Sequence, residues 1–552
     1  MIKKLYKPTF IFLLAILISL PIILPYFHPG YFPTHDGEWA VVRLGDMFRS
    51  LRDHQFPVRY SGNLNFGYGY PLFNFTYPAP YYLGIILHFF KLGFVDSIKF
   101  LFAGSVVLSS ITMYLFSTEL WKNKTAGIIS AIFYVYLPYR IVDLYARGSI
   151  GESLSFVLFP LIAICALKIL DNINTKFYIV FGSISYALLI LTHNIMALLF
   201  TPILFTFIAA KMFLVKNKSY INSIIFILLS YALSAFFWLP ALLEKHYIAL
   251  SITPIADRNI YFVQLNQLLL PNWGYGLPDG PNGFSYQIGI GHLVVLITVL
   301  ILIIYSLVKR KKISKDNNFI FAFVIIGIVF VLTLLMFSFT KAIWQVIPLL
   351  HEINYPWTLL AQIGFLISLL AGFLWTQKNL FKYLAFGLCL LSIILIIPHA
   401  KPERVFDKGD GYYLTNDATT TSSDELMPLW VKQKPRINRD KKAEIIKGIG
   451  GISSLNTNSK KINFLSELKT NSIIQLNTIY YPGWNAFIDG KQIPISYSNP
   501  KGLMQINVPT GNHRIDLNFS ETSERLISDI ISLVGLFVVI IYLTQIFYFV
   551  KK

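Results

Sequence analysis

Hydrophobic residues are gathered in long unbroken runs along most of this chain, separated by short polar stretches. Twelve runs have about the length that a helix needs to cross the hydrocarbon of a bilayer. They cover residues 9–27, 98–118, 125–141, 153–170, 177–192, 195–213, 221–240, 288–308, 318–337, 357–376, 381–398 and 526–549. The pattern therefore predicts a polytopic α-helical membrane protein with about twelve spans.

Residues 399–525 follow a different pattern, with a polar, turn-rich start and then short segments in which apolar and polar positions alternate. Asp489-Gly490 is a strong two-residue hairpin signal, and Thr510-Gly511-Asn512 is a second turn. The predicted strands are 443–448, 461–466, 472–479, 484–488, 491–496, 503–508 and 513–519. We expect a transmembrane domain over 1–398, a soluble β-sandwich over 399–525, and a final helix with a short tail over 526–552.

Charge indicates which way the helices run. The chain has 55% hydrophobic and only 14% charged residues, yet its net charge is +19. If the N-terminus is cytoplasmic, that side receives nineteen basic residues against three acidic ones, as the positive-inside rule requires. The positive charge is then a topology signal, and we expect no nucleic-acid partner. Both termini would be cytoplasmic in a plasma-membrane protein.

One apolar stretch, residues 80–94, is too short and is bracketed by Pro80 and Gly93. Counting it as a span would invert every later loop, so we predict a helix lying in the outer membrane interface. The long segments 28–97, 142–152, 241–287 and 399–525 then all face the non-cytoplasmic side. Cys165 and Cys389 fall inside predicted spans and are expected to be packing residues.

The sharpest group of polar residues follows the first span, where His35, Asp36 and Glu38 precede an amphipathic stretch. A carboxylate here could act as a general base, or Asp36 and Glu38 could together hold a divalent cation such as Mg²⁺ or Mn²⁺. The alternative is a helix N-cap with acids in the first turn, which needs the same residue types. Spacing alone leaves both open.

A second candidate region, residues 60–82, is dense in aromatic residues and glycine, with Arg59 before it and Tyr70 inside it. Aromatic faces suit stacking against sugar rings, but they equally suit an aromatic belt at the membrane interface.

A third candidate group is Arg140, Asp143, Arg147 and Glu152 in the second outer segment. The first three share one helical face, and two arginines near the lipid surface could clamp a phosphate. They could equally form structural salt bridges. His193 at a span end is a weaker candidate. Six further polar residues are more typical of satisfied interfacial groups: Glu244, His246, Arg258, Lys341, His351 and Glu352.

The motifs HDGEW, GYGYPLFNFTYPAPYYLG and PYRIVDLYARGSIGE, on a first span followed by an acidic loop and interfacial helices, resemble the GT-C superfamily of membrane glycosyltransferases. More closely, they resemble the bacterial membrane family labelled 6-pyruvoyl-tetrahydropterin synthase-related. The C-terminal motifs SSDELMP and YYPGWNAFIDG resemble the related YfhO-like proteins.

The resemblance implies that Asp36 is the catalytic base, Glu38 its partner or a metal ligand, and Arg147 with Glu152 the contacts to donor phosphate and acceptor. Thr358 stands where these families are expected to have arginine after Pro-Trp. The implied activity moves a sugar from a polyprenyl-phosphate carrier to an envelope glycan, lipid or protein. The β-sandwich would bind or position that acceptor.

Two rival functions use the same sequence features. A lipid flippase or transporter would need charged residues in mid-span, and the sequence has almost none there. A non-catalytic envelope scaffold would bind glycans or partners through the β-sandwich and would not depend on Asp36.

Overall fold

The computed structural model describes residues 8–215, 220–277, 280, 282–308 and 317–551. Within these residues, ten helices are long and apolar enough to cross a membrane, and two bent helix pairs raise the number to twelve. The single helices are α1 (Pro8–Ile23), α5 (Phe94–Trp121), α8 (Ile150–Leu170), α9 (Thr175–Thr192), α10 (Asn194–Val215), α14 (Ile290–Val308), α15 (Asn317–Leu335), α17 (Leu360–Trp375), α18 (Asn379–Ile396) and α20 (Ser523–Lys551). The predicted membrane class and number of spans are confirmed.

The bundle has a protein-packed centre and an apolar outer surface. Helix α17 is buried from Leu360 to Leu374 and packs against α6, α14 and α15. Helix α20, by contrast, leaves large apolar side chains such as Leu533 and Phe537 exposed. An apolar exterior of this kind is costly in water and favourable in lipid.

Two predicted spans are bent rather than straight. Helix α6 (Lys124–Val135) continues into α7 (Pro138–Val142) and a π-helical turn (Asp143–Arg147) at an angle of 46°. Pro138 has no N–H to continue the helical ladder, which explains this break. Helix α11 (Tyr220–Leu233) meets α12 (Ala235–Leu243) at 69°, where the Phe236 N–H donates to Ser532 Oγ of α20 (2.8 Å).

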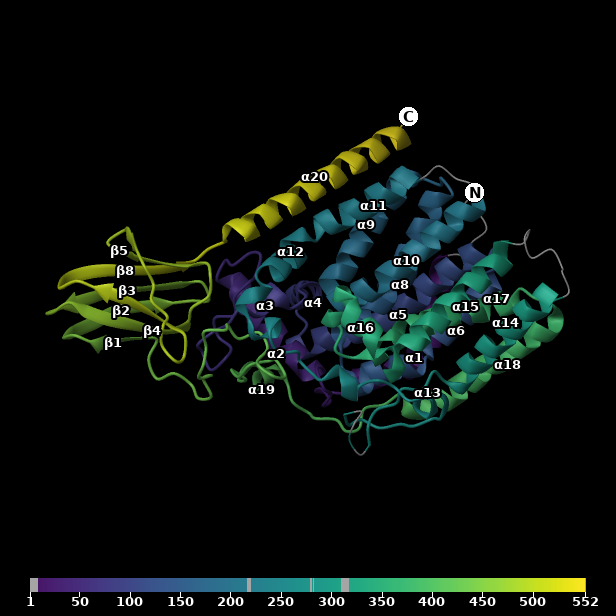
Figure 1. Ribbon diagram of the computed structural model, residues 1–552, viewed down its shortest axis with the longest axis horizontal. Helices are drawn as coiled ribbons and strands as arrows, with labels where there is room; N and C mark the ends of the chain where they lie inside the picture. The colour runs from purple at the N-terminus through teal and green to yellow at the C-terminus, as the bar shows by residue number, and fades with distance from the viewer. Residues whose placement is uncertain (1–7, 216–219, 278–279, 281, 309–316, 552) are drawn as a thin grey trace.

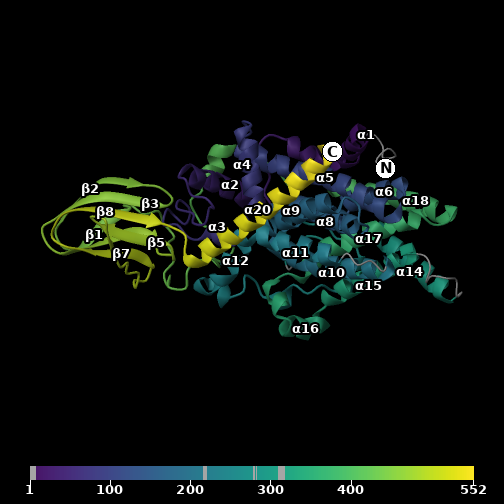
Figure 2. The same cartoon turned by 90° about the horizontal axis from the view of Figure 1, so that it is seen from above.

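The segment between α1 and α5 forms short helices. They are α2 (Gly37–Arg52), α3 (Leu72–Phe75) and α4 (Ala79–Phe89). Helix α4 has 11 residues, packs against α2 and α5, and is too short to cross a membrane. This agrees with the prediction that residues 80–94 do not form a span. Figure 2 shows α2 and α4 near the end of the bundle that faces the β-domain.

The C-terminal domain is a sandwich of two antiparallel sheets, as predicted. One sheet has the order β1-β4-β7 and the other β2-β3-β8-β5-β6. The strands are β1 (Ala443–Lys447), β2 (Gly450–Thr457), β3 (Lys461–Leu468), β4 (Ser472–Ile479), β5 (Trp484–Ile488), β6 (Lys491–Ile493), β7 (Leu503–Val508) and β8 (Gly511–Phe519). The β5–β6 hairpin turns at Asp489 and Gly490, both with positive φ, as the hairpin signal predicted.

The sandwich projects from one end of the helical bundle, and α20 runs from it along the bundle (Figure 1). Residues 400–442 form no part of either sheet. They contain the short helix α19 (Asp410–Leu414) and form isolated β-bridges to the loops of the helical domain, Tyr31 to Phe406 and Ile248 to Pro428. This segment therefore ties the two parts of the molecule together.

Several residues of the charge argument lie outside the described residues, and the orientation in the membrane stays a prediction. They are Lys3, Lys4, Lys7, Lys216, Lys218, 309–312, Lys315, Asp316 and Lys552.

Candidate active site around Asp36

The loop that carries Asp36 is held against the π-helical turn Asp143–Arg147. The Asp36 N–H donates to the Arg147 carbonyl (2.8 Å), and the His35 N–H donates to the Ala146 carbonyl (3.0 Å). Gly148, which ends the turn with φ +64°, makes this approach possible, because a Cβ there would lie 2.2 Å from Thr34 Oγ1. Two segments more than a hundred residues apart thus meet at Asp36.

The Asp36 side chain does not cap helix α2, so the N-cap alternative fails for this residue. Thr34 Oγ1 instead accepts the Gly37 N–H (2.9 Å). The Asp36 carboxylate is half-buried and accepts no hydrogen bond from any described residue. Burial raises the pKa of Asp36, while Arg147 and Arg43 act in the opposite direction. A free carboxylate with a raised pKa suits a general base.

Arg147 approaches Asp36 from the end of the bent span. Its Nη1 lies 2.5 Å from Glu152 Oε1 and 3.7 Å from Asp143 Oδ1, and it donates to Tyr139 Oη (2.9 Å). The guanidinium also lies over the Trp357 ring, 4.6 Å from its centre. Glu152 is only 1% exposed, and its ion pair with Arg147 holds the guanidinium in position.

Arg43 also lies near enough to Asp36 to lower the pKa of its carboxyl group, and sequence analysis missed it. Its Nε donates to Thr420 Oγ1 (3.0 Å), and its Nη groups reach the Thr420 carbonyl and Tyr81 Oη. Tyr70 Oη also lies 3.2 Å from Thr420 Oγ1; Tyr70 is fully buried, and burial raises its pKa to about 12. Arg43 lies seven positions after Asp36, about two helical turns along the amphipathic stretch, so this signal was present in the sequence.

An aromatic wall completes the site. Tyr77 stacks on His193 with ring centres 5.1 Å apart and lies parallel to Tyr81 at 6.4 Å. His193 Nε2 is 3.9 Å from Glu152 Oε1. The structure therefore brings together Asp36, Arg147, Glu152 and His193 from the predicted set, with Arg43, Tyr77 and Thr420 added.

Glu38 does not join this group. Two residues along a helix point to nearly opposite sides, and Glu38 interacts electrostatically with Arg404, Tyr31 and Tyr413. Burial raises the pKa of Glu38. Among the described residues no group of three His, Cys, Asp or Glu side chains could hold a metal ion. The divalent cation stays a prediction.

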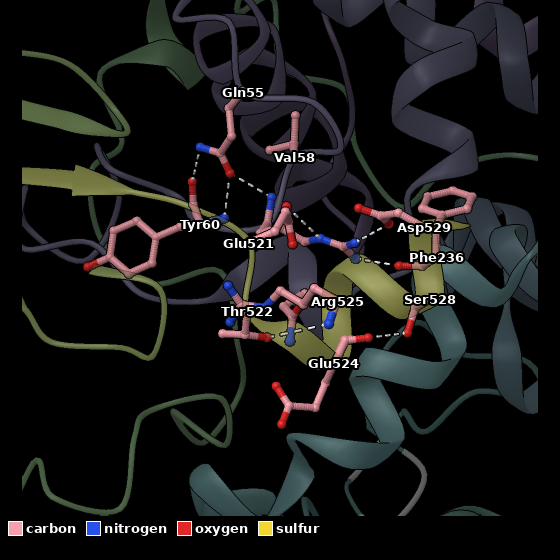
Figure 3. Close-up of polar contacts among 12 residues, drawn as sticks. Gln55, Val58, Tyr60, Phe236, Glu521, Thr522, Glu524, Arg525, Ser528 and Asp529 are labelled. Atoms are coloured by element: carbon pink, nitrogen blue, oxygen red, sulfur yellow. Dashed lines mark hydrogen bonds and ion pairs between the residues drawn. The ribbon is translucent and has the colours of Figure 1, made fainter. Parts of the chain in front are cut away.

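Arg59 is also placed elsewhere. It forms ion pairs with Asp529 (2.8 Å) and Glu521 (3.4 Å) of the C-terminal segment and donates to the Phe236 carbonyl; these three partners are labelled in Figure 3. Nearby, Glu244 pairs with Arg525 (2.8 Å). We name this group of five charged residues the junction, because it joins the first loop, α12 and α20.

The remaining predicted residues lie at the margins of the site. The His35 Nε2 contacts the Tyr275 carbonyl (2.9 Å), and burial lowers the pKa of His35. Arg140 is 1% exposed, donates to Ser105 Oγ (3.0 Å) and lies over the Phe156 ring. His35 thus borders Asp36 and acts electrostatically on its carboxylate, whereas Arg140 is not placed with the group around it.

Comparison with solved structures finds distant likenesses. The arabinofuranosyltransferase AftD from Mycobacteria matches with 15% identity and a TM-score of 0.46, over 74% of this chain and 28% of that one. The oligosaccharyltransferase of Archaeoglobus fulgidus matches with 14% identity and a TM-score of 0.42, over 77% of this chain and 61% of that one. A second structure of that protein, AglB in complex with an inhibitory peptide and a dolichol-phosphate, has a TM-score of 0.41. The chain thus spans less than two thirds of either protein.

No curated protein matches this sequence. A family described as a 6-pyruvoyl-tetrahydropterin synthase related domain, a membrane protein, matches residues 73–402. Because this match covers more than half of the 552 residues, the chain belongs to the 6-pyruvoyl-tetrahydropterin synthase-related family of membrane proteins.

Proposed function

We propose that the protein is a membrane glycosyltransferase that moves a sugar from a polyprenyl-phosphate carrier to an acceptor on the non-cytoplasmic side. One observation carries the proposal. The Asp36 carboxylate is half-buried and free of hydrogen bonds from described residues, yet it lies beside two arginines that are themselves firmly held. A base next to a fixed pair of cations is what transfer from a phosphate-linked donor requires.

The chemistry follows from these charges. Asp36 takes the proton of an acceptor hydroxyl as its oxygen attacks the anomeric carbon. The bond from that carbon to the phosphate oxygen breaks, and its electron pair stays on the departing phosphate. Arg147 and Arg43 stabilise the negative charge that develops there, because both are charged and preorganised before reaction. Attack opposite the leaving group inverts the anomeric configuration.

The neighbouring residues support these roles. Glu152 and Tyr139 hold Arg147 in place, and Thr420 holds Arg43. Tyr77 offers a ring for stacking against a sugar. Thr358 donates to the Tyr355 carbonyl (2.7 Å) and is buried next to Trp357, on whose ring Arg147 lies, so position 358 offers no cation to a phosphate.

A purified, liposome-reconstituted protein tests the proposal. Radiolabelled polyprenyl-phosphate sugars would be supplied with membrane glycolipid, glycan and peptide acceptors, and label transfer would be followed. We expect transfer from at least one donor, its loss in Asp36→Asn, and its retention in Glu38→Gln, the matched neighbouring carboxylate. Absence of transfer from every donor would overturn the proposal in favour of the scaffold. Donor-independent lipid movement across the liposome would favour the flippase.

A further inference from the structure

A polar cleft of about 610 Å³ lies on the outward face of the β1-β4-β7 sheet. A second hollow of about 590 Å³ adjoins it and shares Tyr68, Gln433, Ile437 and Lys501 with it. The floor of the cleft is the sheet, and one wall is the segment 433–441. A continuous groove of this size accommodates an extended chain of several sugar units better than a single small molecule.

The floor is a row of amide and carboxylate groups. Glu444, Gln475 and Asn477 of β1 and β4 line it, and Gln475 stands opposite Glu444 on one side and Gln505 of β7 on the other. Gln505 Nε2 donates to Gln475 Oε1 (2.9 Å), and Asn477 Nδ2 donates to Glu444 Oε1 (2.9 Å). These bonds fix the side chains and use both amide N–H groups of Gln475 and Asn477, so the row offers a ligand oxygen lone pairs that accept its hydroxyl protons. A preorganised amide row of this kind suits the many hydroxyl groups of a saccharide.

The rim is basic. The two hollows are lined by five basic and two acidic side chains. Lys434 is paired with Asp424 (3.2 Å), but the other four form no ion pair with a described residue. These four are Lys432, Arg436, Lys441 and Lys501. Unpaired positive charge above a hydroxyl-binding floor favours a saccharide that carries acidic groups.

The cleft is connected to the candidate active site. Tyr68 belongs to the first loop, and the Lys501 ammonium lies over its ring, 5.9 Å from the centre. Two residues further on, Tyr70 contacts Thr420, which in turn accepts a hydrogen bond from Arg43. The same loop therefore lines the cleft through Tyr68 and contacts the Asp36 site through Tyr70.

We propose that this cleft binds an acidic saccharide chain, with sugar hydroxyls on the amide row and carboxylate or phosphate groups on the basic rim. That this saccharide is the acceptor of the transferred sugar rests on the proposed transferase function. The binding itself does not, because the cleft lies in the β-domain and does not contain Asp36.

The experiment measures binding to the full-length protein in detergent by isothermal titration calorimetry. The probes are tetragalacturonate, the uncharged galactotetraose, and a short polyphosphate. We expect tetragalacturonate to bind at least about ten-fold more tightly than galactotetraose, with affinity falling as salt rises. Gln475→Ala should weaken tetragalacturonate about ten-fold and leave polyphosphate unchanged, because only the saccharide uses the amide row.

Charge variants and matched controls complete the test. Lys441→Glu with Lys501→Glu should abolish tetragalacturonate binding, whereas Lys461→Glu with Lys491→Glu, on the opposite sheet, should not. Equal binding by wild type and the cleft variants would overturn the proposal, as would equal affinity for the neutral probe. Asp36→Asn should bind tetragalacturonate normally. If tetragalacturonate binds but no donor supports transfer, the proposed transferase function is contradicted and the proposed saccharide binding is retained.

Discussion

The Asp36 site and the junction contain the same kinds of side chain, arginines next to carboxylates, but they use them differently. In the junction, Glu244 accepts hydrogen bonds from Asn74, Tyr481, Thr522 and Arg525 and is 2% exposed. Asp36, near two arginines, accepts none from the described residues and is half-buried. The difference shows that the partners of a charged group, rather than its residue type, separate a structural ion pair from a reactive one.

We expect the largest loss of stability when the ion pairs of the junction are broken. Arg525→Met leaves Glu244 buried with an uncompensated charge, which should cost about 3–5 kcal/mol of unfolding free energy. Thermal unfolding in detergent, with turnover corrected for the folded fraction, checks this. The double variant Arg525→Met with Glu244→Gln should recover part of the loss. Equal instability of the single and double variants would contradict the ion-pair explanation.

The close approach of the Asp36 loop gives the second prediction. Gly148→Ala adds a Cβ that would lie 2.2 Å from Thr34 Oγ1, at a φ of +64°. We expect a loss of about 1–3 kcal/mol of stability and a clear fall in transfer, because the Asp36 loop must shift. Gly411→Ala is the control, since a Cβ there meets nothing within 4 Å. Unchanged transfer in Gly148→Ala would show that this contact does not position Asp36.

The smallest effect concerns the electrostatics of the site. Arg43 lowers the pKa of Asp36, so Arg43→Met should raise it. The base acts only when deprotonated, and the acid limb of the rate profile should therefore move to higher pH by about half a unit to one unit. Initial transfer rates measured against pH test this. An acid limb that stays in place, or moves to lower pH, would contradict the effect of Arg43 on the pKa of Asp36. Arg52→Met, at the far end of α2, is the control.

Much of the fold could be predicted from the sequence, because a long apolar run in a bilayer forms a spanning helix that satisfies its own backbone hydrogen bonds. The bend at Ser234 was not predictable, since it depends on contacts with α20. Strand β2 was missed because Gly450, Gly451, Ser453 and Ser454 have low strand propensity, and pairing with β3 decides its structure.

The site was predicted in part. Asp36 and Arg147 were both candidates, but their contact depends on how the loop packs against the π-helical turn. Thr420 gave no sequence signal, because its role comes from a distant segment folding back onto α2. Arg59 and Arg147 were both candidates in the sequence, Arg147 also through the family resemblance, and their partners in the structure separate them.

Whether Asp36 is the base is decided by the pH dependence of the initial transfer rate, measured in wild type and in Asp36→Asn at saturating donor, once equal thermal stability of the two has been verified. We expect the wild-type rate to fall as pH drops through the raised pKa of Asp36, at a pH above the ordinary aspartate value of about 4. In Asp36→Asn this acid limb should be absent, and the rate should be lower by at least about a hundred-fold. A variant that keeps the same limb and the same rate would show that Asp36 is not the base.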